Sequence, residues 1–294
     1  MPVHTRMSGG KMRRRRASAA GKPGGGAMRI AAEGEAMTHC DSCGTPVPAR
    51  QPVQSDGRRL CEGCFLAAAH PVPAGHGELH AGFAEALADA LDLREHETGM
   101  HSRRVACHTL VLARRFTDDE ETLHQIYWGA LLHDLGKIGV PDRILLKDGR
   151  LDEAEWIVMR RHAADGHRIV SRLPGMETAA AIVLSHEERF DGSGYPQALR
   201  GAAIPFGARL FAVIDTLDAM TSDRPYRRAL PFEAARAEIV VMTGRQFDPA
   251  AVDAMLAEEA VLRKMVEMKC IQADIRAEQP GPREEHGEPP RRGS

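Results

Sequence analysis

The sequence has little that would place it in a membrane, on nucleic acid or outside the cell. No run approaches the roughly 18 apolar residues that a membrane-spanning helix needs, and no apolar stretch of the signal-peptide kind follows the basic N-terminus. The net charge of -2 at pH 7 gives no general reason to expect a nucleic-acid or membrane partner. We therefore expect a cytoplasmic protein without either partner.

Strand patterns are also scarce, because few segments alternate between apolar and polar residues, and no internal repeat is visible. From about residue 78 to 277, apolar residues instead recur at three- and four-residue spacing, as in FAEALADALDL (83–93) and IYWGALLHDL (126–135). This spacing predicts an all-α helical bundle. We expect the bundle to end in one long helix from about 249 to 277.

The remaining segments differ in composition from the helical one. Residues 1–36 are low in bulky apolar groups and contain the basic cluster KMRRRR. This composition predicts a disordered segment, or a segment that lies upstream of the true start of the protein. An electrostatic arm is the alternative. Residues 37–68 form a small cysteine unit, 69–77 a linker, 78–277 the helical domain and 278–294 a disordered tail.

Four of the six cysteines form two Cys-x-x-Cys pairs, CDSC and CEGC, with 17 residues between them. Tetrahedral sets of four thiolates suit zinc, and each pair offers two sulfur atoms to one ion. A unit of this size buries too little apolar surface to fold without such help. We expect a zinc-ribbon-like domain with one structural Zn, and a redox or iron-sulfur site is the alternative. The ligands are Cys40, Cys43, Cys61 and Cys64.

The helical segment carries histidines and acids in contexts that suit metal binding. His133 and Asp134 follow an apolar stretch, and Lys137 lies one turn further on. Each residue alone has an ordinary structural explanation, but imidazole and carboxylate groups from several helices together suit Fe, Mn or similar ions in a bundle interior. The other candidates are Glu97 and His101, which would share a helix face, His162, His186, and Asp215 in an otherwise apolar helix.

Residues from about 85 to 257 resemble the HD-GYP domain family, a branch of the HD metal-dependent phosphohydrolases. The motifs that carry the resemblance are HSRRV, LLHDLGKIGVPD, ILLKDGRLDEAEW, ERFDGSGYP, RGAAIPFGARL, DAMTSDRPYRRAL and GRQFDP, in the family's order and spacing. The resemblance implies an all-α fold and a centre of two or three metal ions, often iron or manganese. It also implies phosphodiesterase activity on cyclic di-GMP, giving pGpG or GMP.

The resemblance also assigns roles to individual residues. It implies one ion held by His101, His133, Asp134 and Asp215, with Asp134 bridging to a second ion held by His162 and His186. Glu97 matches an acidic position of the family members that hold a third metal, and Lys137 matches a lysine close to the scissile phosphate. Arg224 and Arg227 match positions that contact substrate, with surface salt bridges as the alternative.

The sequence departs from the family at one position. The family usually has His-His-Glu where this chain has His186-Glu187-Glu188. Glutamate is itself a ligand for hard cations, so Glu187 is compatible either with a third ion of altered preference or with a two-metal site.

For the loop that follows, with Tyr195 at its centre, the resemblance suggests contact with the substrate or with a GGDEF-type diguanylate cyclase, and structural bracing of the chain is the alternative. A phosphodiesterase of another cyclic nucleotide and a signalling or scaffold module are the alternative functions. A homodimer is compatible with each of them.

Overall fold

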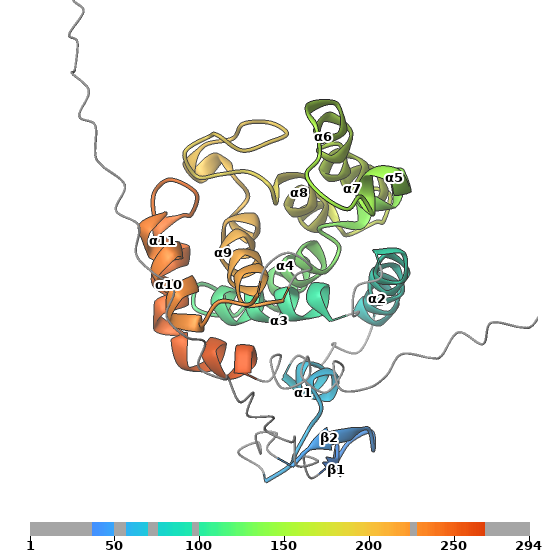
Figure 1. Ribbon diagram of the computed structural model, residues 1–294, viewed down its shortest axis with the longest axis vertical. Coiled ribbons are helices and arrows are strands. Elements are labelled where there is room, and N and C mark those ends of the chain that lie inside the picture. Colours follow the sequence, from blue (N-terminus) through green and yellow to red (C-terminus); the bar gives the residue numbers. More distant parts are fainter. Residues whose placement is uncertain (1–36, 50–56, 70–75, 96–99, 224–227, 268–294) are drawn as a thin grey trace, which may run out of the picture. The chain divides into compact units, whose positions relative to one another are not determined.

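The computed structural model describes residues 37–49, 57–69, 76–95, 100–223 and 228–267 (Figure 1). Within these ranges no helix combines the length and apolar character needed to cross a membrane. The remaining residues, among them the basic cluster, Glu97, Arg224, Arg227 and the C-terminal segment, lie outside the described residues.

The cysteine unit consists of a short hairpin and a helix. Strand β1 (Met37–His39) pairs antiparallel with β2 (Pro46–Pro48), with Thr38 opposite Val47. Helix α1 (Glu62–Ala69) begins inside the second Cys-x-x-Cys pair. The buried apolar residues of the cysteine unit are Cys40, Val47 and Leu60. This core is too small to stabilise a fold by apolar burial alone.

The helical domain confirms the expected all-α class. Its elements are α2 (His76–Glu95), α3 (His101–Ala113), α4 (Glu120–Leu131), η1 (Leu135–Gly139), α5 (Asp142–Leu145), α6 (Glu153–Met159), α7 (His162–Val170), α8 (Glu177–Ser185), η2 (Gly201–Ala203), α9 (Phe206–Met220), α10 (Phe232–Val241) and α11 (Pro249–Ala257).

Helices α3, α4, α8 and α9 pack against one another around a shared apolar core (Figure 1). Side chains such as Leu112, Ile126, Ile182 and Leu210 are almost fully buried there. Helix α7 and the short η1 pack together beside α8. The ends of these elements position the polar side chains described below.

The expected single long helix at the C-terminus is wrong in the described residues. Helix α11 ends at Ala257, Glu258 forms a turn, and a second helical stretch covers 259–267. The turn allows Leu262 and Met265 to reach the core, and the Glu258 carboxylate pairs with Arg115 at 2.9 Å. No glycine or proline marks this turn, so the apolar spacing did not reveal it.

Candidate metal centre

His133 and Asp134 occupy the short connection between α4 and η1. Leu132 caps the C-terminus of α4, and Asp134 is the residue immediately before η1. The connection follows a buried stretch of α4, and His133 is only 3% exposed. The chain therefore leaves a core helix and presents an imidazole and a carboxylate within two residues.

Three histidines are oriented by the same backbone contact. The Nδ1 atoms of His133, His162 and His186 lie 2.8, 2.7 and 2.7 Å from the carbonyl oxygens of the residues three positions earlier. Since a carbonyl only accepts hydrogen bonds, each Nδ1 donates, and Nε2 of the neutral ring is left as a bare lone pair. Fixing one ring nitrogen in this way is typical of histidines that bind metals.

The ligand atoms gather in two groups of three. The first group is His101, His133 and Asp215, and the second is Asp134, His162 and His186; within each group the atoms lie within 4.8 Å of one another. The structure thus brings together six of the eight residues predicted as ligands in the helical domain.

Asp134, a member of the second group, also reaches a residue of the first. Its Oδ2 is 3.0 Å from His133 Nε2, and its Oδ1 is 3.5 Å from His162 Nε2 and 3.8 Å from His186 Nε2. One carboxylate therefore offers an oxygen to each group. This is the arrangement that a bridging ligand requires.

The geometry of the second group fits a cation. The Nε2 atoms of His162 and His186 are 3.0 Å apart, and both Nδ1 atoms are occupied as donors. Two neutral rings in this arrangement would point lone pairs at each other in a buried site, which is favourable only if a cation or a proton lies between them. A divalent ion bound by imidazole and carboxylate meets that requirement.

Burial and neighbouring charges push the pKa values of the centre apart. Burial acts to lower the pKa of His133, but the charges of Asp134 and Asp215 outweigh it and raise that pKa to about 9. Burial together with His133 and His162 lowers the pKa of His186 to about 3. Although burial opposes it, His133 and Lys137 hold the pKa of Asp134 well below its usual value. Such divergence is common at functional sites.

Comparison with known proteins identifies the family. Residues 85–251, more than half of the chain, match the family model described as HD domain. The chain belongs to the HD domain family. This match confirms the HD part of the resemblance, which the sequence analysis placed at His133-Asp134.

Two curated relatives of this HD domain are named as phosphodiesterases. The chain is 40% identical over 197 residues to the cyclic di-GMP phosphodiesterase response regulator RpfG of Xanthomonas campestris pv. campestris, covering 66% of this chain and 51% of that protein. It is 38% identical over 172 residues to the 3'3'-cGAMP-specific phosphodiesterase 2 of Vibrio cholerae, covering 58% of this chain and 33% of that protein. The chain thus spans about half the length of these relatives or less.

A solved structure supports the fold of the HD domain. The crystal structure of a cyclic GMP-AMP-specific phosphodiesterase of V. cholerae superposes with a TM-score of 0.50 at 20% sequence identity, over 66% of this chain and 52% of that one. At this identity the likeness concerns the fold, and it agrees with the HD-type helical bundle expected from the sequence.

Lys137 and Glu187 flank the HD centre without belonging to either ligand group. Lys137 Nζ is 2.7 Å from Asp134 Oδ2. Glu187 Oε1 is 4.0 Å from His162 Nε2, and its backbone carbonyl accepts a hydrogen bond from Tyr195 N at 3.3 Å. Burial raises the pKa of Glu187. Glu187 is therefore beside the second group and already bound to the loop that follows it.

Glu188 points away from the HD centre and holds the loop. Its buried carboxylate accepts hydrogen bonds from the backbone N–H groups of Gln197 at 2.7 Å and Leu199 at 3.1 Å. Asp191 accepts a hydrogen bond from Ser193 N at 3.0 Å. The loop is braced mainly by Glu188, which leaves Tyr195 beside the centre.

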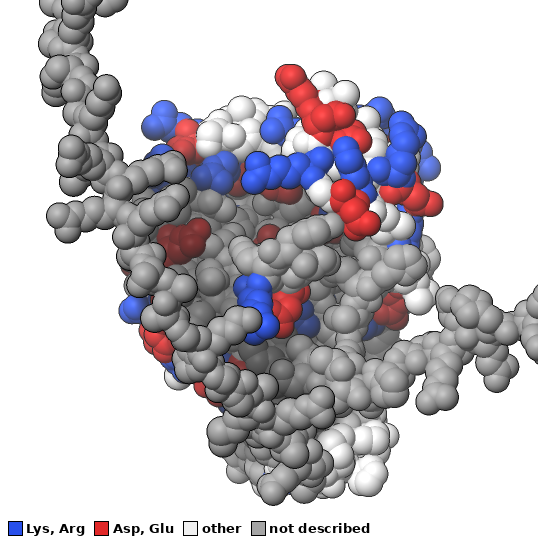
Figure 2. All heavy atoms as spheres, in the orientation of Figure 1, with Lys and Arg blue, Asp and Glu red and all other residues white. Residues whose placement is uncertain are grey.

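Aromatic and basic side chains form a rim next to the HD centre. The Tyr195 ring centroid is 6.4 Å from that of His162, and the Arg160 guanidinium lies 5.2 Å from the Tyr195 ring and 5.8 Å from the Trp156 ring. Lys and Arg side chains are numerous over α5, α6 and α7, with acidic side chains among them (Figure 2). A rim of this composition suits a ligand with bases and phosphates.

Sequence reasoning did not identify Asp218 as part of the HD centre. Its Oδ2 is 2.8 Å from His101 Nδ1, and its Oδ1 accepts a hydrogen bond from Arg104 Nε at 2.8 Å. Burial acts to lower the pKa of His101, but Asp218 raises it. Spacing was the available signal. Asp218 lies three residues after Asp215 on α9, and residues three positions apart lie on the same face of a helix.

The four cysteines of the small unit come together as predicted. Their Sγ atoms lie within 4.8 Å of one another, and Cys43 Sγ is 3.7 Å from Cys61 Sγ. Burial acts to raise the pKa of Cys40, but backbone N–H groups, including those of Cys61 and Cys43, lower it to about 6. A thiolate surrounded by N–H groups and three more sulfur atoms suits a soft tetrahedral ion.

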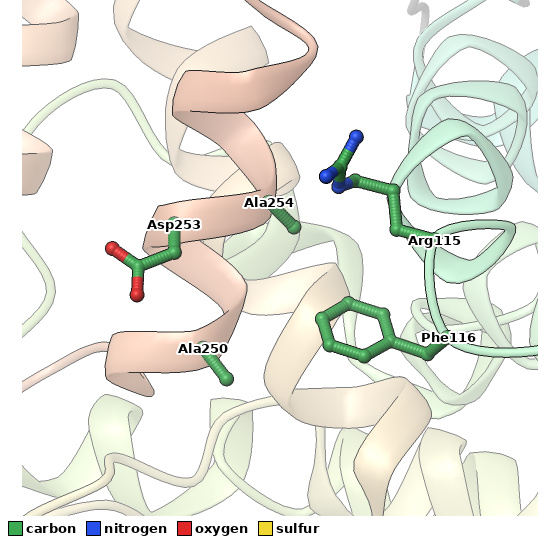
Figure 3. Close-up of a pocket in the computed structure, with 5 residues that line it drawn as sticks. All are labelled: Arg115, Phe116, Ala250, Asp253 and Ala254. Carbon is green, nitrogen blue, oxygen red and sulfur yellow. The ribbon is translucent and has the colours of Figure 1, made fainter.

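A separate cavity of about 260 Å³ lies between the end of α3 and α11 (Figure 3). It is lined by Arg115, Phe116, Ala250, Asp253 and Ala254. Phe116 packs edge-on against Phe206, and Arg115 pairs with Glu258. None of its lining residues belongs to either ligand group, so this cavity is distinct from the HD centre.

Proposed function

We propose that this chain is a metal-dependent phosphodiesterase that hydrolyses cyclic di-GMP. The observation that carries the proposal is the position of Asp134, with one oxygen facing each of two groups that contain histidines. Relatives named as cyclic dinucleotide phosphodiesterases, at about 40% identity, support the substrate class.

Two ions, iron or manganese, would occupy the HD centre. His101, His133 and Asp215 would hold the first, His162 and His186 the second, and Asp134 would bind both. Imidazole and carboxylate ligands suit these borderline and hard ions. We further propose two ions and not three, because Glu187 belongs to neither ligand group.

The protein residues position the substrate and balance charge around these ions. When bound, a pair of divalent ions supplies an activated water and neutralises charge on a phosphodiester. Lys137, beside Asp134, adds a cation where a phosphate would approach. Tyr195 would contact a base or the ribose, and Arg160 lies over its ring. Arg224 and Arg227 remain proposed phosphate contacts outside the described residues.

A second substrate, 3'3'-cGAMP, is favoured by the similarity to the V. cholerae phosphodiesterase. The test is to measure kcat/KM for cyclic di-GMP and 3'3'-cGAMP on the same metal-replete protein. We expect cyclic di-GMP to be preferred, with pGpG as the main product. A preference for cGAMP would change the substrate assignment, and turnover of neither would leave a signalling or scaffold module.

Glu187→Ala should leave about two ions per chain, because this carboxylate belongs to neither ligand group. Turnover should fall modestly, by about threefold to tenfold, because a negative charge 4.0 Å from His162 Nε2 is lost. Glu187→Gln is the companion variant, since it keeps the shape of the side chain and removes only its charge. Glu187→His should raise iron or manganese occupancy. Metal analysis showing three ions in the wild-type protein and two in Glu187→Ala would refute the two-metal proposal.

The cysteine unit is proposed to hold one structural Zn. Replacing Cys40 and Cys43 by serine should release about one equivalent of zinc and unfold the unit, because the ion supplies most of its folding free energy. Turnover at saturating manganese should stay within about tenfold of the wild type. Cys107→Ser, in the buried core of α3, is the control and should retain zinc. A wild-type protein purified anaerobically without zinc would contradict this assignment.

The partners and location remain proposals. The loop around Tyr195 is available for a GGDEF-type diguanylate cyclase, since its outer residues Ser193 and Pro196 are exposed. A homodimer and a cytoplasmic location stay predictions from the sequence.

A further inference from the structure

A continuous chain of buried charges connects the cysteine unit with the HD centre. Glu62 lies between Cys61 and Cys64, and its Oε1 is 3.4 Å from Arg104 Nη1 on α3. Arg104 donates to both oxygens of Asp218, at 2.8 and 3.2 Å. Asp218 Oδ2 in turn lies 2.8 Å from His101 Nδ1.

We propose that Glu62 is a positioning residue for the HD metal centre and makes metal binding there depend on the ion of the cysteine unit. Glu62 would act through Arg104 and Asp218 on His101. The inference rests on the proposed two-metal function, and it gives the cysteine unit a regulatory role in addition to a structural one.

His101 is the histidine of the centre that depends most on distant residues. The rings of His133, His162 and His186 are each held by the backbone carbonyl group three residues earlier in the chain. His101 Nδ1 is held instead by a side chain, that of Asp218. Such an outer carboxylate fixes the ring and raises the basicity of the nitrogen that binds the ion. The first ion is therefore sensitive to whatever positions Asp218.

Arg104 is shared between two carboxylates in a buried environment. The side chains of Glu62 and Arg104 are each 8% exposed, and that of Asp218 is 2% exposed. At such burial, charge pairs are little screened by solvent. Glu62 both orients the guanidinium and takes part of its positive charge. Without Glu62, Arg104 would act on Asp218 alone and weaken its hydrogen bond to His101.

The position of Glu62 is set by the cysteines around it. Glu62 is the first residue of α1, and the turn is closed by Cys64 N to Cys61 Sγ at 3.4 Å and by Phe65 N to Cys61 O at 2.9 Å. The Phe65 side chain packs against both apolar cores. Because the core of the unit is so small, an ion on the four sulfur atoms would hold this turn in place. Loss of the ion, or oxidation of the thiols, would release Glu62.

Calorimetric titration of Mn²⁺ into full-length protein tests the proposal, with the HD centre emptied and the cysteine unit still zinc-loaded. Glu62→Gln and Asp218→Asn should each weaken one of two Mn²⁺ sites by about tenfold or more, as outer-shell changes do. The Cys40→Ser/Cys43→Ser variant should weaken the same site. In the Glu62→Gln background, the cysteine changes should add little, because both act along one path.

Glu85→Gln is the matched control. Glu85 pairs with Arg103, the neighbouring arginine of α3, which also pairs with Asp89. Its Mn²⁺ affinities should equal those of the wild type. Circular dichroism would verify that each variant is folded, and Glu62→Asp, which keeps the charge, should recover part of the lost affinity.

The outcomes separate this inference from the proposed function. Unchanged Mn²⁺ affinity in a folded Glu62→Gln protein, with weakened binding in Asp218→Asn, would overturn the role of Glu62 and leave the two-metal centre intact. A wild-type protein that binds no Mn²⁺ at the HD centre would overturn both. Additive effects of the Glu62 and cysteine changes would show that the two act separately, which also contradicts the proposal.

Discussion

Asp134→Ala should remove both ions from the HD centre and lower phosphodiesterase turnover by about 1000-fold or more. One carboxylate faces both ligand groups, so its loss affects two ions at once. It also leaves three buried histidines, His133, His162 and His186, close together without the anion that favours a cation among them. The measurement is metal content per chain together with pGpG formation from cyclic di-GMP.

Asp142→Ala is a suitable control for this change. Asp142 is an exposed acid eight residues further on, and it pairs with Arg94. Its replacement should leave metal content and turnover near wild-type values. Asp134→Asn, which keeps the shape but not the charge, should also lose metal. An Asp134→Ala protein that remains metal-replete and active would rule out the bridging role.

Gly136→Ala should separate η1 from α7 and empty the second metal site. A Cβ at position 136 would lie 1.9 Å from the carbonyl oxygen of His162 and 2.5 Å from Gly166 N, both backbone atoms that cannot move aside alone. Overpacking of this kind costs about 3 kcal/mol of stability. Because the displaced segment carries Asp134 and the opposing one carries His162, we expect loss of at least one ion and most of the turnover.

Gly139→Ala, in the same short helix, provides the matched comparison. A Cβ there would meet only the Asp165 carboxylate at 3.8 Å, an ordinary contact. Chemical denaturation of the metal-free proteins, with metal analysis of the loaded ones, would compare the two variants. Gly139→Ala should resemble the wild type. If Gly136→Ala did so as well, the close packing of η1 on α7 would not be required for the site.

The metal ligands could be predicted from the sequence, but the residues that hold the ligand side chains in place could not. The HD pair and the four other ligand residues that join it from separate helices could be found because each interrupts an apolar helix or belongs to a spaced motif. Asp218 and Glu62 could not be found in this way. Their partner Arg104 is 114 positions from Asp218 and 42 from Glu62, and helical spacing relates only residues within a few turns.

Other features escaped prediction for local reasons. The turn at Glu258 has no glycine or proline to mark it, and apolar residues continue on both sides. Glu187 and Glu188 are identical in the sequence, yet one faces the centre and the other accepts loop N–H groups. The side chains of adjacent residues diverge, but which of the two turns inward depends on tertiary contacts. Glu97, Arg224 and Arg227 remain predictions.

The most direct test of the two-metal phosphodiesterase is a titration of protein from which the HD-centre metal has been removed. Mn²⁺ or Fe²⁺ would be added anaerobically while hydrolysis of cyclic di-GMP is followed. The account predicts negligible activity at the start and a plateau at about two equivalents per HD domain, with Asp134→Ala inactive throughout. Full hydrolysis before any ion is added, or none at two bound equivalents, would contradict it.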